Sequence, residues 1–144
     1  MDVYYTGQFV LPLPEGHRFP MAKYHILRDR LVAEYAGIEL KTAMPASDGM
    51  LALAHTPEYI RELTSGSILA CAMREIGFPW SEAMVARARL SVGATIGACR
   101  SALKNGLAAN IAGGTHHSYA HKGSGFCVFN DSAVAARLMQ AEWG

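Results

Sequence analysis

The chain has 144 residues, of which 51% are hydrophobic and 17% are charged, a composition that supports one folded domain and excludes a disordered chain. Its 13 Lys and Arg residues nearly balance its 12 Asp and Glu residues, so there is no electrostatic reason to expect nucleic acid as a partner. No apolar run approaches the roughly 20 residues of a membrane-spanning helix, and the start MDVYYTGQFV lacks the basic region of a signal peptide. We therefore expect neither a nucleic acid nor a membrane partner.

The three cysteines, Cys71, Cys99 and Cys127, are odd in number and widely spaced. This usage fits free thiols in a reducing compartment better than a disulfide framework. The expected location is the cytoplasm.

The first predicted element is a short strand at DVYY, residues 2–5. The prolines of residues 11–20 exclude regular structure from the next segment. Apolar residues at steps of three and four then predict a helix from Met21 to about Tyr35. A second helix is predicted after Thr56, a good N-cap that is followed by Pro57 at the first helical position.

The longest predicted helix runs from its cap at Ser81 to about Lys104, with Gly106 as its stop signal. One face of this helix is apolar: Met84, Ala88, Val92, Ile96, Cys99 and Leu103. Gly93 and Gly97 lie inside it, and each costs roughly 1 kcal/mol of helix propensity. We therefore expect a neighbouring segment to pack closely against both glycines.

After this helix, the stretch LAANIAGG is short, apolar and ended by glycine, as expected of a buried parallel strand. A last helix is predicted from Asn130 through SAVAARLMQAEW. Helices that alternate with short buried strands indicate an α/β fold, in which two strands can be placed. Ligands of such folds bind beyond the carboxyl ends of the strands, where the stretch GGTHHSYAHKGSGFCVFND, residues 113–131, begins.

Residues 113–131 therefore form the candidate site. Gly113 and Gly114 let the backbone turn sharply and pass close to a ligand. His116 and His117 lie in an irregular loop and are expected to point in different directions, one toward a substrate and the other behind it. A lone histidine is more often a packing or surface residue, but a pair at this position favours function. Neutral imidazole is a suitable base near pH 7.

Three interpretations of this stretch remain open on the residues alone. In the first, His116 and His117 move protons and stabilise charge around an attacking water. In the second, they form a metal site with His121 and Cys127, although the spacing matches no closed zinc motif. In the third, Cys127 is a nucleophile, but it lies between two apolar residues and buried cysteines are usually inert.

The same stretch resembles the signature of the zinc-dependent histone deacetylase family, which includes bacterial acetylpolyamine and acetoin-utilisation relatives. The resemblance rests on Gly-Gly-x-His-His at 113–117, on Gly-Phe-Cys at 125–127 after seven intervening residues, and on Asn-Asp at 130–131. Upstream, HTPEYI at 55–60 resembles the family's His-x-x-x-Tyr-Ile/Leu segment, and the helix with GATIGA at its centre resembles the helix before the histidine strand. Essentially the whole chain is similar to the N-terminal part of such an enzyme.

The resemblance implies catalytic roles for the histidine pair. His117 matches the principal general base and acid, and His116 matches a residue that stabilises charge. In the family, a zinc ion polarises the amide carbonyl and binds the attacking water, and a tyrosine helps to hold the oxyanion.

The resemblance also implies a substrate-binding set. Gly125 matches the residue whose backbone carbonyl receives the substrate amide N–H. Phe126 matches one wall of the narrow tunnel that grips the acyl-lysine stem, and Cys127 matches a residue at the inner end of that tunnel. Gly114 is counted with this set because it lets the backbone approach a ligand. The pair at 130–131 matches the start of the next helix and is expected to be structural.

The implied fold is the arginase/deacetylase-type parallel sheet with helices on both faces, incomplete in this chain. The family's zinc ligands, its oxyanion tyrosine and the carboxylates that orient the two histidines come later than the match reaches. We therefore expect residues 1–144 to be one domain-sized, N-terminal segment of a deacetylase domain that stops before the metal ligands. Zn²⁺ is expected in the complete enzyme, with none of its ligands in this chain.

The implied function is zinc-dependent removal of acetyl groups from an acetylated lysine peptide or a small acetylated amine. Alone, residues 1–144 are expected to be inactive. Their exposed sheet edge would favour self-association or a partner fragment. The alternative is a non-catalytic, deacetylase-like interaction module or an inactive fragment.

Overall fold

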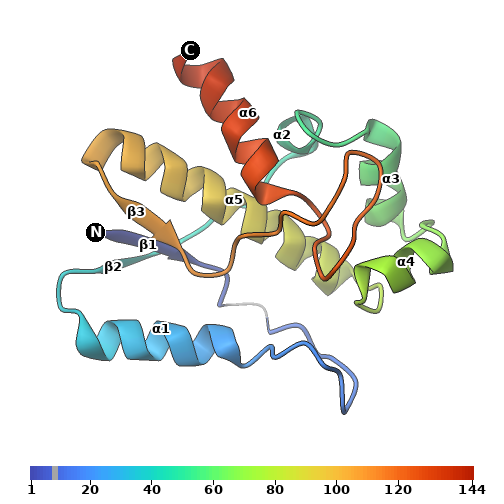
Figure 1. Ribbon diagram of the computed structural model, residues 1–144, viewed down its shortest axis with the longest axis horizontal. Coiled ribbons are helices and arrows are strands. Elements are labelled where there is room, and N and C mark those ends of the chain that lie inside the picture. Colours follow the sequence, from blue (N-terminus) through green and yellow to red (C-terminus); the bar gives the residue numbers. More distant parts are fainter. Residues whose placement is uncertain (8–9) are drawn as a thin grey trace.

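The computed structural model describes residues 1–7 and 10–144 and has a three-stranded sheet with helices around it (Figure 1). The predicted α/β class is confirmed. In chain order, the elements are β1 (Asp2–Tyr5), α1 (Lys23–Glu34), β2 (Glu39–Thr42), α2 (Asp48–Leu51), α3 (Pro57–Ser65), α4 (Ala70–Ile76), α5 (Glu82–Asn105), β3 (Ala108–Asn110) and α6 (Asp131–Trp143).

The sheet has the strand order β2–β1–β3, and both strand pairs are parallel. Val3 of the central strand lies opposite Leu40 on one side and Ala109 on the other, and its side chain is buried. Parallel pairing places the carboxyl ends of all three strands at one edge of the sheet. The segment that follows β3 starts from this edge.

Helices cover both faces of the sheet because successive strand residues point to opposite sides (Figure 1). The Tyr4 ring packs against Gly97 of α5. The next residue, Tyr5, has its ring under the Arg28 guanidinium of α1, 5.9 Å from the ring centroid. The predicted arrangement of a parallel sheet between helices is thus confirmed.

The long helix α5 agrees with its predicted bounds. The Ser81 hydroxyl accepts the Met84 N–H at 3.0 Å, and Gly106 follows the last turn. A Cβ on Gly93 would overlap the carbonyl oxygen of Met44, and one on Gly97 would lie 2.5 Å from the Tyr4 ring. Close packing therefore explains both glycines, as predicted.

The main core lies beside the sheet, between α5 and the helices α2, α3, α4 and α6. The space between these helices is filled by side chains that are almost completely buried: Leu51, Leu63, Ile76, Met84, Val92, Phe129 and Val134. Phe129 belongs to the segment between β3 and α6. Burial of an aromatic ring of this size contributes roughly 2–3 kcal/mol, so the core itself fixes this segment.

Three elements were not predicted. β2 alternates polar Glu39 and Lys41 with one apolar residue, which is a weak strand signal at the edge of a sheet. The helices α2 and α4 have four and seven residues, too few to show a helical period. The count of two strands from the sequence was therefore wrong.

One expectation about burial was also wrong. The strand β3 is half-buried rather than buried, because within the described residues it is the outer strand of the sheet. Leu107, just before it, is 64% exposed. The helix α1, all of whose residues are described, buries none of its side chains completely.

None of the helices in the described part of the chain combines the length and the hydropathy needed to cross a bilayer.

Substitution of Gly93 by Ala should destabilise the fold, although alanine is the better helix former. The new methyl group meets the backbone carbonyl of Met44, which cannot move as a flexible side chain would. We expect a loss of about 1–3 kcal/mol in the free energy of unfolding, measured by urea denaturation. Gly49→Ala in α2 is the control, since its Cβ would meet only the Ser47 hydroxyl at 3.9 Å. An unchanged or raised stability of the Gly93→Ala variant would contradict this packing.

Candidate active site

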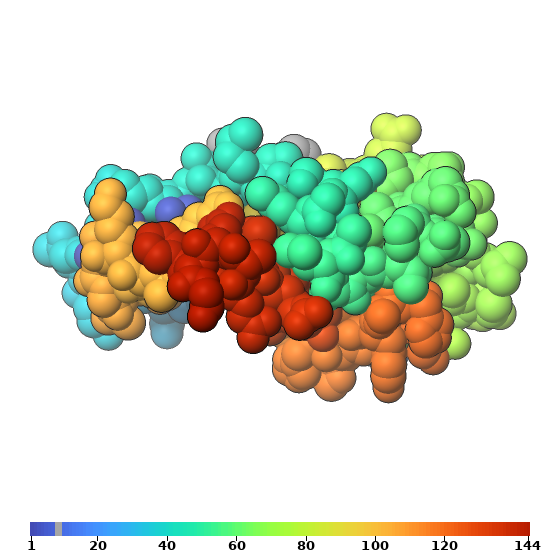
Figure 2. Space-filling model, turned by 90° about the horizontal axis from the view of Figure 1, so that it is seen from above, coloured from blue at the N-terminus to red at the C-terminus, as the bar shows by residue number. Residues whose placement is uncertain are grey.

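The segment between β3 and α6, residues 111–130, contains the predicted site. It leaves the carboxyl end of β3, passes beside α5 and reaches α3 and α4 before it returns to α6 (Figure 1). In the space-filling view this orange segment lies against the green helices (Figure 2). We call residues 111–130 the histidine loop.

The buried carboxylate of Asp131 holds the start of the histidine loop. It accepts the backbone N–H groups of Gly114 at 2.9 Å and Thr115 at 2.8 Å, and the Thr95 hydroxyl of α5 at 2.6 Å. A Cβ on Gly113 would lie 2.6 Å from the same carboxylate. Gly114 has a φ of +84°, so it makes the turn, whereas Gly113 leaves room for Asp131.

Asn130 ties the middle of the loop to α6. Its side-chain oxygen accepts the Ala133 N–H at 3.0 Å and so caps the helix. Its amide nitrogen donates to the carbonyl oxygens of Ser118 at 3.1 Å and His116 at 3.4 Å. The structural role predicted for residues 130–131 is confirmed, and it extends to the shape of the histidine loop.

The segment HTPEYI, residues 55–60, binds the C-terminal end of the histidine loop. His55 is buried, and its Nε2 accepts the Asn130 N–H at 2.9 Å, so the ring is neutral with its proton on Nδ1. Burial lowers the pKa of His55. The Tyr59 hydroxyl donates to the Val128 carbonyl oxygen at 2.8 Å, and burial raises the pKa of Tyr59. The sequence alone contained no signal for these contacts.

His116 and His117 lie side by side, with ring centroids 4.4 Å apart and planes at 35°. The expectation that they point in different directions was wrong. The His116 Nδ1–H donates to the Gly114 carbonyl oxygen at 2.9 Å, which folds this ring back toward its neighbour. Both side chains are exposed, and no carboxylate of residues 1–7 and 10–144 bonds to either ring.

Gly125 and Phe126 form a strained turn beside His117. Their φ values are +54° and +64°, a region that phenylalanine rarely adopts. Their N–H groups donate to the carbonyl oxygens of Glu75 at 3.1 Å and Ile76 at 2.7 Å, at the end of α4. A Cβ on Gly125 would lie 3.5 Å from His117. The fold thus brings His117 next to the residues predicted to bind substrate.

Cys127 lies underneath this turn. Its thiol is buried and points to the Gly125 carbonyl oxygen at 3.6 Å, and burial raises the pKa of Cys127. A nucleophilic cysteine requires a lowered pKa and access, so the geometry disfavours that interpretation. Within the described ranges, no three His, Cys, Asp or Glu side chains gather as a metal ion would require.

An aromatic cluster, which the sequence did not reveal, surrounds Phe126. The rings of His17, Phe19 and Phe78 lie 5.9, 5.1 and 5.2 Å from its centroid. These residues come from the β1–α1 loop and from the end of α4, and nothing in the local pattern connects them. His17 had no chemical signal of its own in the sequence.

Comparison with known proteins fits this geometry. A family model described as the histone deacetylase domain matches residues 17–144. The chain belongs to the histone deacetylase family. The predicted family resemblance is therefore confirmed.

Two curated relatives are similar along nearly the whole chain. An uncharacterized protein of Picosynechococcus sp. is 41% identical over 140 residues, which cover 96% of this chain and 47% of the relative. The acetoin utilization protein AcuC of Bacillus subtilis is 29% identical over 150 residues, covering 97% of this chain and 38% of AcuC. The chain thus spans less than half the length of these relatives.

Solved deacetylase-family structures share the fold. The crystal structure of an HDAC homolog complexed with SAHA matches with a TM-score of 0.75 and 26% identity. The match covers 99% of this chain and 41% of the homolog. The parallel sheet and the helices around it are therefore part of the deacetylase fold.

Replacement of Asp131 by Asn should loosen the start of the histidine loop. The new amide group would place N–H donors against the N–H groups of Gly114 and Thr115. We expect a loss of about 1–3 kcal/mol in the free energy of unfolding and faster amide hydrogen exchange at these two residues. The exposed Asp29→Asn is the control, and equal effects of both variants would contradict the anchoring role.

Burial of His55 should make the stability depend on pH. The pKa of His55 in the folded chain lies below the unfolded value near 6.5. Between these two pKa values, His55 is protonated in the unfolded chain and neutral in the folded chain. The contribution to stability is complete above pH 6.5 and is lost as the pH falls toward the folded pKa. Denaturation between pH 7.5 and 5 should show this decline. His55→Gln keeps an acceptor for the Asn130 N–H but cannot titrate, so its decline should be shallower.

Proposed function

We propose that the protein containing residues 1–144 is a deacetylase, which hydrolyses an N-acetyl amide to acetate and a free amine. The observation that carries the proposal is the position of His117 beside the Gly125–Phe126 turn. A proton-transfer group thereby lies next to a narrow aromatic wall that can hold an acyl-amine stem. Family membership supports the same reaction.

In this proposal His117 transfers protons and His116 stabilises charge. His117 takes a proton from the attacking water and gives one to the departing amine nitrogen, so that water adds across the broken C–N bond. His116 stabilises the charge that develops, since its Nδ1–H is held by Gly114 and its ring lies against His117. Gly125, Phe126, Cys127 and Gly114 would shape the substrate channel.

The residues described here do not fit a zinc ion by themselves, because no three suitable side chains come together. We propose that zinc and its ligands belong to the part of the deacetylase domain that lies outside residues 1–144. The coverage of only 47% and 38% of the relatives' lengths supports a segment of a longer domain. The carboxylates that orient the two exposed histidine rings would come from the same part.

The outer edge of the sheet supports the proposal that the rest of the domain lies outside residues 1–144. Among residues 1–7 and 10–144, no strand pairs with the outer edge of β3, and the nearby side chains of Leu103 and Leu107 are exposed. We propose that further strands, a second copy or a partner fragment pair with this edge. The proposed substrates are an acetylated lysine peptide or a small acetylated amine, in line with the SAHA complex of the similar HDAC homolog.

A non-catalytic interaction module is the second candidate, and one observation favours it. Both histidine rings are exposed and lack an orienting carboxylate among the described residues. A domain that keeps the deacetylase fold without the metal half would bind acetylated ligands but release no acetate.

In the complete domain, His117→Ala should lower kcat on an acetyl-lysine peptide by about 10²–10⁴-fold, because proton transfer is lost. The zinc content, measured by atomic emission, should stay unchanged. His121→Ala is the matched control: it removes an exposed histidine from the same loop and should leave kcat unchanged. Loss of zinc in the His117→Ala variant would instead identify His117 as a metal ligand.

Residues 1–144 alone should release no acetate from an acetyl-lysine peptide, even with added Zn²⁺. The complete domain, assayed in parallel, should release acetate in proportion to its zinc. Turnover by the 144-residue chain would contradict the division of the site between two parts of the domain. Binding without turnover by the complete domain would favour the interaction module.

A further inference from the structure

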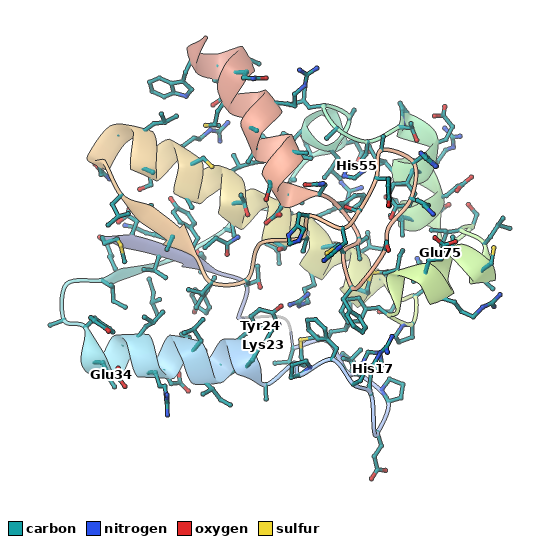
Figure 3. All side chains as sticks on the ribbon, viewed as in Figure 1. His17, Lys23, Tyr24, Glu34, His55 and Glu75 are labelled. Atoms are coloured by element: carbon teal, nitrogen blue, oxygen red, sulfur yellow. The ribbon has the colours of Figure 1, made fainter. Side chains whose placement is uncertain are left out.

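The β1–α1 loop is tied to the same helix end that holds Phe126. His17 Nδ1 accepts the Phe19 N–H at 3.1 Å, so its Nε2 carries the proton and donates to the Gly77 carbonyl oxygen at 2.9 Å. The His17 ring also stacks on Phe78, with planes at 13°. Figure 3 shows His17 where this loop approaches α4. The loop backbone therefore has a fixed position relative to Phe126.

This anchoring places Arg18 over the predicted tunnel wall. Arg18 lies between two fixed neighbours, and its guanidinium is 5.5 Å from the centroid of the Phe126 ring. A second cation, the Lys23 ammonium, lies 4.7 Å from the centroid of Phe19, in the same aromatic cluster. Cations over aromatic faces are attracted by the ring quadrupole, so both charges are held near the wall.

Within the described ranges, neither of these two cations forms an ion pair with a carboxylate. The ion pairs among the described residues include neither Arg18 nor Lys23. Glu75, at the end of α4, is already paired with Lys122 at 2.9 Å. We call residues 17–23 together with Phe126 the rim of the predicted tunnel. This rim therefore carries positive charge that no carboxylate neutralises by an ion pair among the described residues.

A guanidinium that lies over a ring keeps its N–H edges free. Those edges match the two oxygens of a carboxylate and form paired, charge-assisted hydrogen bonds. Arg18 is exposed, so such a carboxylate can reach it from solvent. A polycationic chain at the same rim would meet two like charges instead.

We propose that Arg18 recognises a carboxylate on the substrate, at the end of the amine stem that is remote from the acetyl group. This inference rests on the proposed function, and it narrows the substrate class to acetylated amines that carry an acidic group beyond the stem. An acetyl-lysine with acidic neighbours in a peptide and free Nε-acetyl-lysine share this chemistry. Acetylated polyamines lack it.

The test is the affinity of the complete domain, with the His117→Ala substitution to prevent turnover, for four ligands. These are an acetyl-lysine peptide flanked by Asp, the same peptide flanked by Lys, free Nε-acetyl-lysine and an acetylated polyamine. Calorimetry gives each Kd. We expect the Asp-flanked peptide or free Nε-acetyl-lysine to bind at least about threefold to fivefold more tightly than the two polycations. If the Asp-flanked peptide binds more tightly than free Nε-acetyl-lysine, the carboxylate belongs to a neighbouring residue of a peptide. If free Nε-acetyl-lysine binds more tightly, it is the carboxylate of the amino acid itself.

Arg18→Gln should remove this preference, and Arg18→Lys should keep part of it because the charge remains. Arg30→Gln, an exposed arginine on α1, is the matched control and should change nothing. The proposal is overturned if Arg18→Gln keeps the preference, if the polycations bind as tightly, or if no ligand binds. Acetate release by the domain without the His117→Ala substitution is measured separately. Its absence would contradict the proposed function, while a carboxylate preference that depends on Arg18 would still stand.

Discussion

The buried carboxylate of Asp131 is the interaction on which the candidate site depends. It joins three elements that are far apart in the chain: the long helix α5 through Thr95, the turn after β3 through Gly114 and Thr115, and α6, which begins at Asp131 itself. A fully buried carboxylate without such donors would be strongly destabilising. The requirement to satisfy it therefore fixes the path of the histidine loop.

The end of α4 provides the second constraint. Its last carbonyl groups, which a helix cannot satisfy internally, accept N–H groups from Gly125, Phe126 and the His17 ring. These bonds offset the cost of the left-handed backbone at Phe126. One helix end thus places the predicted tunnel wall and the rim loop that carries Arg18. The buried His55, which precedes α3, and the buried Tyr59 of α3 also hold the histidine loop in place.

The candidate site combines buried anchors with an exposed pair of histidines. The groups that would handle protons and grip the substrate are held by buried anchors, while the histidine rings themselves remain exposed. Among the described residues β3 is an outer strand of the sheet, and the side chain of Leu107 just before it is exposed. In the proposed function, the rest of the deacetylase domain would pair with this strand and complete the environment of the two histidines.

Local chemistry in the sequence was sufficient for several features. The caps Ser81, Thr56 and Asn130 placed three helices, Gly93 and Gly97 indicated a close contact, and the spacing of residues 113–131 identified the family. The strand β2 and the cluster of His17 with Phe126 could not be predicted. Both depend on contacts between segments that are distant in the chain, and such contacts produce no regular spacing in the sequence. The sequence by itself determined the helix ends, the glycine contacts and the family. Only the tertiary structure decided which groups meet, because burial and hydrogen bonding at Asp131 and at the end of α4 act across the fold.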